Sequence, residues 1–159
     1  MRFATDASLG KLGRHLRAAG FDTLCQHQCS HAGFFESLDA DRIILTRTET
    51  VRKRFQRRRL IFIQDNDPWR QMLQVVREAR IRPGQLKPFS RCLACNMSVS
   101  PIDSAAVKTR VPAYVWQHQQ GFHECRRCGR VYWRGSHHDR ICMKMATLFR
   151  QKEEKIHGC

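Results

Sequence analysis

The sequence predicts an α/β fold with a central, mostly parallel sheet, followed by a small C-terminal metal-binding module. From residue 1 to about residue 82, strand-like apolar runs alternate with helical patterns, a rhythm typical of parallel sheets with right-handed crossovers. A break at Arg82-Pro83-Gly84 extends to Pro88, and beyond it cysteine pairs and turn residues replace that rhythm. We therefore expect an α/β domain over 1–82, a linker over 83–89, a metal-binding module over 90–150 and a frayed polar tail over 151–159.

Each element of the first half has a local signal. A short strand is expected over 3–5, and apolar residues recur at helical spacing over 9–19, with Gly20 placed as the C-cap. A second strand over 21–24 and a weak helix over 34–39 follow. The apolar runs over 42–46 and 60–63 have the character of buried parallel strands. Asp67-Pro68 pairs an N-cap with a first-turn proline and predicts a helix that runs through Ala79.

Two C-x-x-C pairs are the strongest chemical signal: Cys92 with Cys95, and Cys125 with Cys128. A C-x-x-C turn directs two thiolates inward, and two such turns facing each other give the tetrahedral S4 cage that structural zinc prefers. The alternatives are two disulfides or four unrelated core cysteines. We favour zinc because two such pairs rarely arise in one small chain without a metal.

The charge of the chain is strongly positive. Lys and Arg total 29 against 14 Asp and Glu, a net charge of +15. This excess is typical of proteins that bind phosphate backbones, while an anionic membrane surface or an acidic protein partner are the alternatives. No stretch has the two faces of an interfacial helix, so we predict a nucleic acid, RNA or DNA, as the partner. The oligomeric state stays open.

The start of the chain lacks a signal-peptide pattern, because Asp6 interrupts the short apolar run. No run reaches the roughly 18 apolar residues that span a bilayer. We therefore expect a cytoplasmic protein with no membrane partner, where a reducing environment favours metal and free thiols over disulfides.

Three carboxylates follow predicted strands. Asp6 follows the first strand, Glu49 the third and Asp65 the fourth. In an open parallel sheet the carboxyl ends of strands hold ligands, and clustered carboxylates there would bind Mg²⁺ or Mn²⁺ for phosphodiester cleavage. Asp6 is the best of these candidates, whereas Asp65 fits a turn residue equally well and Asp67 fits an N-cap better.

Four stretches of the chain carry a family resemblance. Residues 6–23 (DASLGKLGRHLRAAGFDT), 42–47 (RIILTR), 90–96 (SRCLACN) and 122–137 (FHECRRCGRVYWRGSH) resemble, in this order, the mut-seven C-terminal RNase domain family, and the similarity extends to about residue 145. The resemblance implies a PIN-like three-layer fold over the first half, followed by a zinc ribbon, with metal-dependent RNase activity. It also implies a supporting role for His137 in the nucleic-acid cleft.

The chain departs from the family pattern at two acidic positions. Thr48 stands where family members carry an acid after the third strand, and Ser30-His31 stands where they tend to carry an acidic pair. Fewer carboxylates weaken a Mg²⁺ site, although Glu49 or Asp65 could supply a ligand. Two functions therefore stay open: a divalent-metal ribonuclease, or a catalytically impaired RNA-binding or protein-interaction module.

Residues 52–59 hold six cations in eight positions. A solvated helix face would also explain such a run, but other cations are expected near the same sheet edge, which favours a phosphate-tracking surface. Tyr132 and Trp133 either stack on unpaired bases or pack against the ribbon. The predicted nucleic-acid-binding residues are Lys11, Arg14, Arg17, Arg47, Arg52, Lys53, Arg57 and His137.

Overall fold

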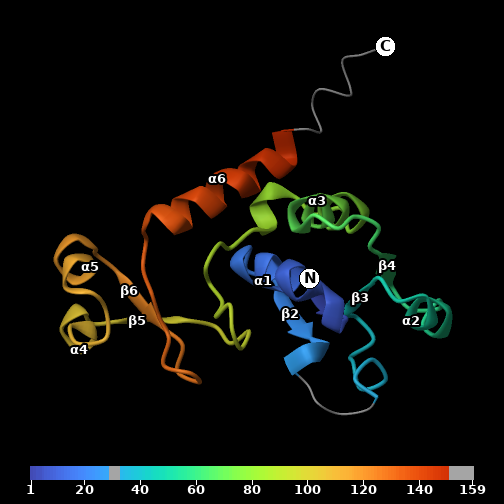
Figure 1. The fold of residues 1–159 in the computed structure, drawn as a ribbon, viewed down its shortest axis with the longest axis horizontal. Helices are drawn as coiled ribbons and strands as arrows, with labels where there is room; N and C mark the ends of the chain where they lie inside the picture. Colours follow the sequence, from blue (N-terminus) through green and yellow to red (C-terminus); the bar gives the residue numbers. More distant parts are fainter. Residues whose placement is uncertain (29–32, 151–159) are drawn as a thin grey trace.

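The structure is a computed structural model that describes residues 1–28 and 33–150, with the side chains of His137 and Arg150 outside that description. The first half contains β1 (Arg2–Thr5), η1 (Ala7–Leu9), α1 (Gly10–Ala18), β2 (Asp22–Cys25), η2 (Gln26–Gln28), β3 (Ile43–Thr46), α2 (Glu49–Arg54), β4 (Leu60–Phe62) and α3 (Pro68–Glu78). The second half contains η3 (Pro83–Gln85), β5 (Ser100–Ile102), α4 (Ser104–Val107), α5 (Ala113–His118), β6 (Phe122–Glu124), β7 (Val131–Tyr132) and α6 (Ser136–Arg150), as Figure 1 shows.

The strands β1 to β4 form one parallel sheet in the order β2-β1-β3-β4. Phe3 of β1 pairs with Thr23 on one side and with Ile43 on the other. The chain therefore leaves β1 toward one edge of the sheet and later returns to the other side of β1. The carboxyl ends of β1 and β3 meet at this reversal, which is the topological switch point where open α/β sheets hold ligands.

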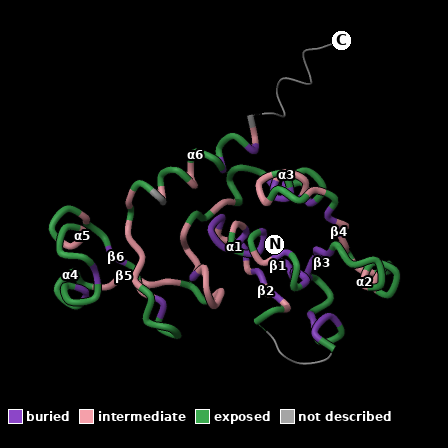
Figure 2. The backbone as a smooth tube through the Cα atoms, in the orientation of Figure 1, coloured by how far each residue is buried: buried purple, intermediate pink, exposed green. Residues whose placement is uncertain are grey.

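The two faces of this sheet are covered by different elements. Phe3, Leu45 and Ile61 pack in one cluster with buried residues of α1, α3 and α6. Ala4 and Ile44 belong to a second cluster, which the turn at 33–38 and α2 complete. Figure 2 shows the buried strands between these two coverings. The predicted α/β fold with a parallel sheet between two layers is confirmed.

The second half forms a small antiparallel sheet, β5-β6-β7. α4 and α5 lie between β5 and β6 in the chain. Val107 of α4, Val111 between the helices and Val115 of α5 pack in one cluster with Phe122 of the sheet. The sheet and the cysteine turns beside it match the predicted zinc ribbon.

The last helix returns to the first half of the molecule. Met145 and Leu148 of α6 are buried in the same cluster as Phe3 and the inner faces of α1 and α3, and α6 runs from the ribbon to α3 in Figure 1. The linker also packs on this body, because the backbone N–H of Phe89 donates to the carbonyl of Ala18 at 2.8 Å. The predicted boundaries at 82 and 90 stay a prediction, but the final helix shares a core with the α/β half.

Most predicted elements lie where the sequence placed them. Gly20 ends α1 with a φ of +95°, and the Asp67 carboxylate caps α3 by accepting from the N–H groups of Trp69 and Arg70. The prediction of a helix over 34–39 is wrong, because this segment forms turns. These turns place Phe34, Phe35 and Leu38 in the second cluster. The tail predicted over 151–159 lies outside the described residues.

None of the helices in the described part of the chain is long and apolar enough to cross a bilayer.

Candidate functional site

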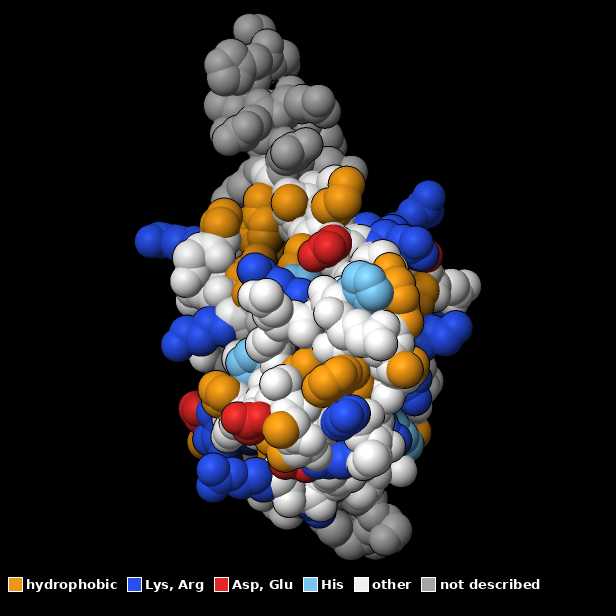
Figure 3. All heavy atoms as spheres, turned by 90° about the vertical axis from the view of Figure 1, so that its left-hand side faces the viewer, with side chains coloured by type: hydrophobic (Ala, Val, Ile, Leu, Met, Phe, Trp, Pro, Cys, Tyr) orange, Lys and Arg blue, Asp and Glu red, His pale blue; other side chains and the backbone are white. Residues whose placement is uncertain are grey.

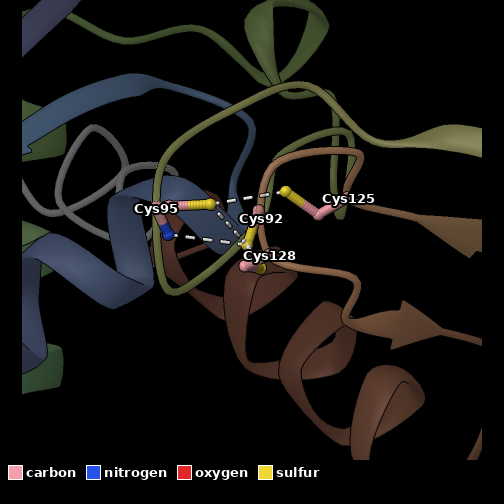
Figure 4. Close-up of side chains that lie close together, drawn as sticks. All are labelled: Cys92, Cys95, Cys125 and Cys128. Carbon is pink, nitrogen blue, oxygen red and sulfur yellow. Dashed lines mark hydrogen bonds between the residues drawn. The ribbon is translucent and has the colours of Figure 1, made fainter.

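The four predicted zinc ligands come together at the junction of the two halves. The Sγ atoms of Cys92, Cys95, Cys125 and Cys128 all lie within 4.8 Å of one another, and Figure 4 shows them converging from two facing turns. The Sγ of Cys95 lies 3.4 Å from that of Cys92 and 3.3 Å from that of Cys125. Sulfurs on a tetrahedral zinc with bonds of about 2.3 Å would be about 3.8 Å apart. The cluster therefore fits a zinc ion, and all described cysteines are free thiols.

The two cysteine turns share one backbone conformation. In the first turn the N–H of Asn96 donates to the carbonyl of Cys92 at 3.0 Å, and in the second the N–H of Gly129 donates to the carbonyl of Cys125 at 2.8 Å. Asn96 has a φ of +65° and Gly129 a φ of +67°, a left-handed conformation that Gly and Asn adopt more readily than other residues. The repeat explains why a glycine or asparagine directly follows each pair.

The hydrogen bonds of the cluster favour negative charge on Cys92. Burial raises the pKa of this thiol, but hydrogen bonds from the Tyr132 hydroxyl and from Cys95 outweigh burial and bring the pKa to about 6. The pKa of Cys95 rises to about 12, because burial and hydrogen bonds with the thiols of Cys125 and Cys92 favour its protonated form. A Zn²⁺ ion at this position would replace the remaining protons, since zinc ligands bind as thiolates. Tyr132 therefore supports the cluster, because its hydroxyl lies 3.1 Å from the Cys92 Sγ and accepts from the N–H of Leu93.

The first cysteine turn is bonded directly to the α/β half. The guanidinium of Arg17 donates to the carbonyls of Leu93 and Ala94 at 3.1 and 2.8 Å and to the carbonyl of Thr23 at 2.9 Å. Arg17 is only 1% exposed. The prediction that Arg17 binds nucleic acid is therefore corrected: its charge is used inside the protein, between β2 and the cysteine turn.

The Asp6 carboxylate lies at the switch point between β1 and β3. Its Oδ1 accepts from the N–H and the hydroxyl of Ser8 at 3.0 and 2.6 Å. Its Oδ2 accepts from the Thr46 hydroxyl and the Arg47 N–H, both at 2.7 Å, and from the Thr48 hydroxyl at 3.4 Å. Asp6 is 3% exposed, and none of the described cations forms an ion pair with it. Buried carboxylates are usually paired with a cation or bound to a metal, so Asp6 is unusual in having only neutral donors.

The other two predicted catalytic acids have different partners. Glu49 is exposed in the first turn of α2 and forms an ion pair with Arg52 at 3.1 Å. Asp65 accepts from the N–H of Asp67 at 2.7 Å and lies 3.7 Å from Arg70. Within residues 1–28 and 33–150, the cysteine cluster is the only group of three or more His, Cys, Asp or Glu with ligand atoms close enough to share a metal. Asp6, Glu49 and Asp65 thus do not form such a group here, and the Ser30-His31 position lies outside the described residues.

The remaining predicted nucleic-acid-binding cations are on the surface. All of them are exposed, namely Lys11, Arg14, Arg47, Arg52, Lys53 and Arg57, whereas the His137 side chain lies outside the described residues. Figure 3 draws the side of the molecule that carries α4 and α5, opposite α2 in Figure 1, and there too Lys and Arg side chains project at both edges while acidic side chains are fewer. Among the described residues, only Arg52 of this set forms an ion pair with a carboxylate.

Three side chains that hold the junction together were not predicted from the sequence. They are Asn96, whose amide bonds to Asp22 and Thr23 of β2, Tyr132 and Gln28. The Gln28 Nε2 donates to the carbonyl of Ala94 at 2.8 Å. Of these three, only Asn96 could have been noticed in the sequence, because it directly follows the first cysteine pair at the position where glycine follows the second pair. A residue with a functional side chain at a glycine-type position indicates a second role.

Comparisons with known proteins give one match. No curated protein and no solved structure matches the chain. The family described as the Mut7-C RNAse domain matches residues 1–145, which is most of the 159 residues and includes both Asp6 and the four cysteines. The chain therefore belongs to the Mut7-C RNAse domain family.

Proposed function

We propose that this protein is an RNA-binding member of its family that binds single-stranded or structured RNA along the carboxyl edge of its parallel sheet. A zinc ion on the four cysteines would stabilise the junction of the two halves. The observation that carries this proposal is a set of exposed cations that follow the strands at that edge, Lys11, Arg47, Arg52 and Lys53, of which only Arg52 forms an ion pair with a described carboxylate. Arg47 directly follows β3 and its backbone N–H bonds to Asp6, and the basic helix α2 begins two residues later. Cations of this kind attract phosphates and release counterions on binding. The free state of the described cysteines suits a reducing compartment such as the cytoplasm.

Salt dependence tests this surface. The affinity of the zinc-loaded protein for a labelled single-stranded RNA is measured by fluorescence anisotropy between 50 and 200 mM salt. The logarithm of the binding constant falls as the logarithm of the salt concentration rises, and for single strands each lost phosphate contact makes this negative slope shallower by about 0.7. The triple variant Arg47→Gln, Arg52→Gln and Lys53→Gln is therefore expected to reduce the size of this negative slope by about 2. Arg57 is left unchanged, because the carbonyl of Arg59 bonds to the N–H of Ile44 near the amino end of β3, away from the carboxyl edge.

A matched control removes the same charge elsewhere. Arg77, Arg80 and Arg82 are exposed at or beyond the end of α3, and because α3 starts at the carboxyl edge of the sheet, its end lies toward the opposite edge. Replacing these three arginines by glutamine should leave the slope nearly unchanged. An equal drop for both triple variants, or wild-type binding that salt does not weaken, contradicts the proposal.

Metal-dependent hydrolysis is the second candidate function, and one observation favours it. Asp6 is a buried carboxylate at the sheet's switch point that has no cationic partner among the described residues, and a Mg²⁺ or Mn²⁺ ion would be held there. Glu49 or Asp65 would have to supply a further ligand, because Thr48 offers only a hydroxyl. When bound, the ion would activate a water and stabilise the charge on the phosphate. Asp6 would hold the ion, and the cations of the edge would position the RNA strand.

Cleavage assays separate the two candidates. Labelled RNA is incubated with Mn²⁺ or with chelator, using wild type, Asp6→Asn and Thr48→Asp. Hydrolysis by wild type that needs Mn²⁺ and disappears in Asp6→Asn supports the nuclease. Binding without hydrolysis in wild type, with metal affinity or activity gained in Thr48→Asp, supports the RNA-binding function. Cleavage that persists unchanged in Asp6→Asn contradicts the role of Asp6.

A further inference from the structure

We propose that a hollow between the linker, the ribbon sheet and the start of α6 binds one unpaired base of the RNA, with its phosphate on Arg134. The hollow has a volume of about 570 Å³, which is within the range of small-molecule sites. This inference rests on the proposed RNA binding and adds a preference for unpaired nucleotides. It concerns a site away from Asp6, since neither Asp6 nor its partners line the hollow.

Rings form much of the wall of this hollow. Phe89 of the linker, Tyr132 and Trp133 of the ribbon, and His138 of α6 all line it. The rings of Phe89 and His138 lie with their centroids 4.3 Å apart. Unpaired bases stack on aromatic and histidine rings, and this stacking tolerates any base because every base has a π-face. A base inside a duplex is already stacked and cannot enter such a hollow.

The backbone holds one of these rings in an uncommon conformation. Phe89 has a φ of +56°, in the left-handed region that bulky residues rarely adopt. Its N–H is fixed by the carbonyl of Ala18 at 2.8 Å, so the α/β half holds Phe89 in place against the ribbon. Backbone strain of this kind gathers at ligand sites, where the surrounding structure maintains it.

The charge and polarity of the hollow suit a nucleotide, which is anionic and carries polar base edges, and not a cationic or purely apolar ligand. Among the described residues no Asp or Glu lines it, and Arg134 supplies its positive charge. Within the described part of the chain, the side chains of Arg134, His123 and Gln120 make no hydrogen bond or ion pair, so their donors are free for phosphate and base edges. By contrast, the larger hollow of about 700 Å³ beside α3 is lined by charges of both signs, Asp65 and Glu78 with Arg70 and Arg77, so it has no excess of positive charge for a phosphate.

The three tryptophans of the chain allow a direct test. Adenosine 5′-monophosphate is added to the zinc-loaded full chain, and the indole N–H signals are followed by NMR, with the Trp133 signal assigned from Trp133→Leu. We expect the Trp133 signal to shift while those of Trp69 and Trp116 stay in place. Inorganic phosphate alone should not reproduce the shift, because the base contacts the ring. A shift that inorganic phosphate produces equally, or no shift of Trp133 at all, overturns the proposal.

Affinity measurements test the preference for unpaired RNA. Removing one stacking ring lowers affinity for a single strand about tenfold, so Trp133→Leu should lose about that factor toward single-stranded RNA and nothing toward a blunt duplex. Because Trp133 also packs against the ribbon core, His123→Ala provides a second variant at an exposed position. Arg134→Gln should weaken single-strand binding more than Arg127→Gln, which removes the same charge from the second cysteine turn. Equal losses for both arginine variants, with no change for His123→Ala, overturn the pocket.

These outcomes separate the pocket from the proposed function. Salt-dependent RNA binding with an unmoved Trp133 signal leaves the RNA-binding function standing and rejects the pocket. A shifted Trp133 signal without any RNA binding supports a nucleotide pocket and rejects the RNA-binding surface.

Discussion

The side-chain amide of Asn96 donates a hydrogen bond of 2.7 Å to the Asp22 carboxylate, and its oxygen accepts from the Thr23 N–H at 2.9 Å. Asn96 thereby pairs with the edge strand β2 as another strand would. Burial alone would raise the pKa of Asp22, but hydrogen bonds from Arg42 and Asn96 outweigh it and hold the pKa at about 2. The first cysteine turn and the parallel sheet therefore share one charged hydrogen-bond network.

Replacing Asn96 by glycine tests this docking. Glycine keeps the left-handed backbone, as Gly129 does in the second turn, so zinc content should stay at wild-type level. Two hydrogen bonds are lost, one of them to a charged group, and the free energy of unfolding should fall by about 2–3 kcal/mol. Urea unfolding of the zinc-loaded protein measures the change. An unchanged midpoint would show that Asn96 does not dock the turn.

Replacing Arg17 by methionine should be more damaging than any surface substitution. The buried guanidinium satisfies carbonyls of β2 and of the cysteine turn, and their loss leaves buried acceptors unpaired. We expect a loss of more than about 3 kcal/mol in the free energy of unfolding. Arg14→Met, on the exposed face of the same helix, is the control and should cost less than about 0.5 kcal/mol. If Arg17→Met instead weakened RNA binding at full stability, its buried role would be refuted.

Removal of zinc should unfold the ribbon before the parallel sheet. Native mass spectrometry is expected to find one zinc per chain, lost in Cys92→Ser and in Cys128→Ser. Structural zinc contributes about 10–16 kcal/mol of binding free energy in zinc-finger peptides, whereas the α/β half has its own core. NMR of the chelated protein should show that β5 to β7 lose their dispersed signals. A metal-free protein with an intact ribbon would contradict the zinc site.

His15 gives the fold a dependence on pH. Burial lowers the pKa of His15 from its ordinary value of 6.5, and Lys144 lowers it further. The unfolded chain therefore takes up a proton below pH 6.5 that the folded chain resists. Stability should be full above that pH and fall as the pH drops from 6.5 toward the folded pKa.

The variant His15→Gln isolates this effect. Its unfolding midpoint, compared with that of wild type between pH 8 and pH 5.5, should decline less steeply, because it lacks the titrating ring that stacks on Trp69 at 4.2 Å. Parallel curves for the two proteins would mean that His15 titrates alike in the folded and unfolded states.

Local signals predicted much of the fold. The apolar runs at β3 and β4 identify strands because both faces of a parallel sheet are buried, and Asp67 identifies a helix start because its carboxylate bonds the first N–H groups. The cysteine cluster was predictable for the same reason, since each pair forms within one short turn. The segment at 34–39 has two adjacent phenylalanines that pack on the same cluster, and its weak helical spacing misled the prediction.

Long-range contacts could not be predicted in this way. Arg17 bonds to residues more than 70 positions away, and on a helical pattern it resembles any other surface arginine. The packing of α6 on α3 and the hollow beside Phe89 likewise depend on how the two halves meet. That Glu49 and Asp65 bond to other groups and not around Asp6 could not be predicted either, because their spacing indicates strand ends and not side-chain distances.

Because α6 packs in the core of the first half, the ribbon is attached to the α/β half at both of its ends, through the linker before it and through α6 after it. A protease that cuts the exposed helices α4 or α5 would therefore sever the polypeptide without releasing a piece. The two fragments should remain associated and elute together under non-denaturing conditions, with Met145 and Leu148 still buried against α3. A circularly permuted chain with its new ends between α4 and α5 should also fold, since the linker and α6, which attach the ribbon to the α/β half, would both stay intact.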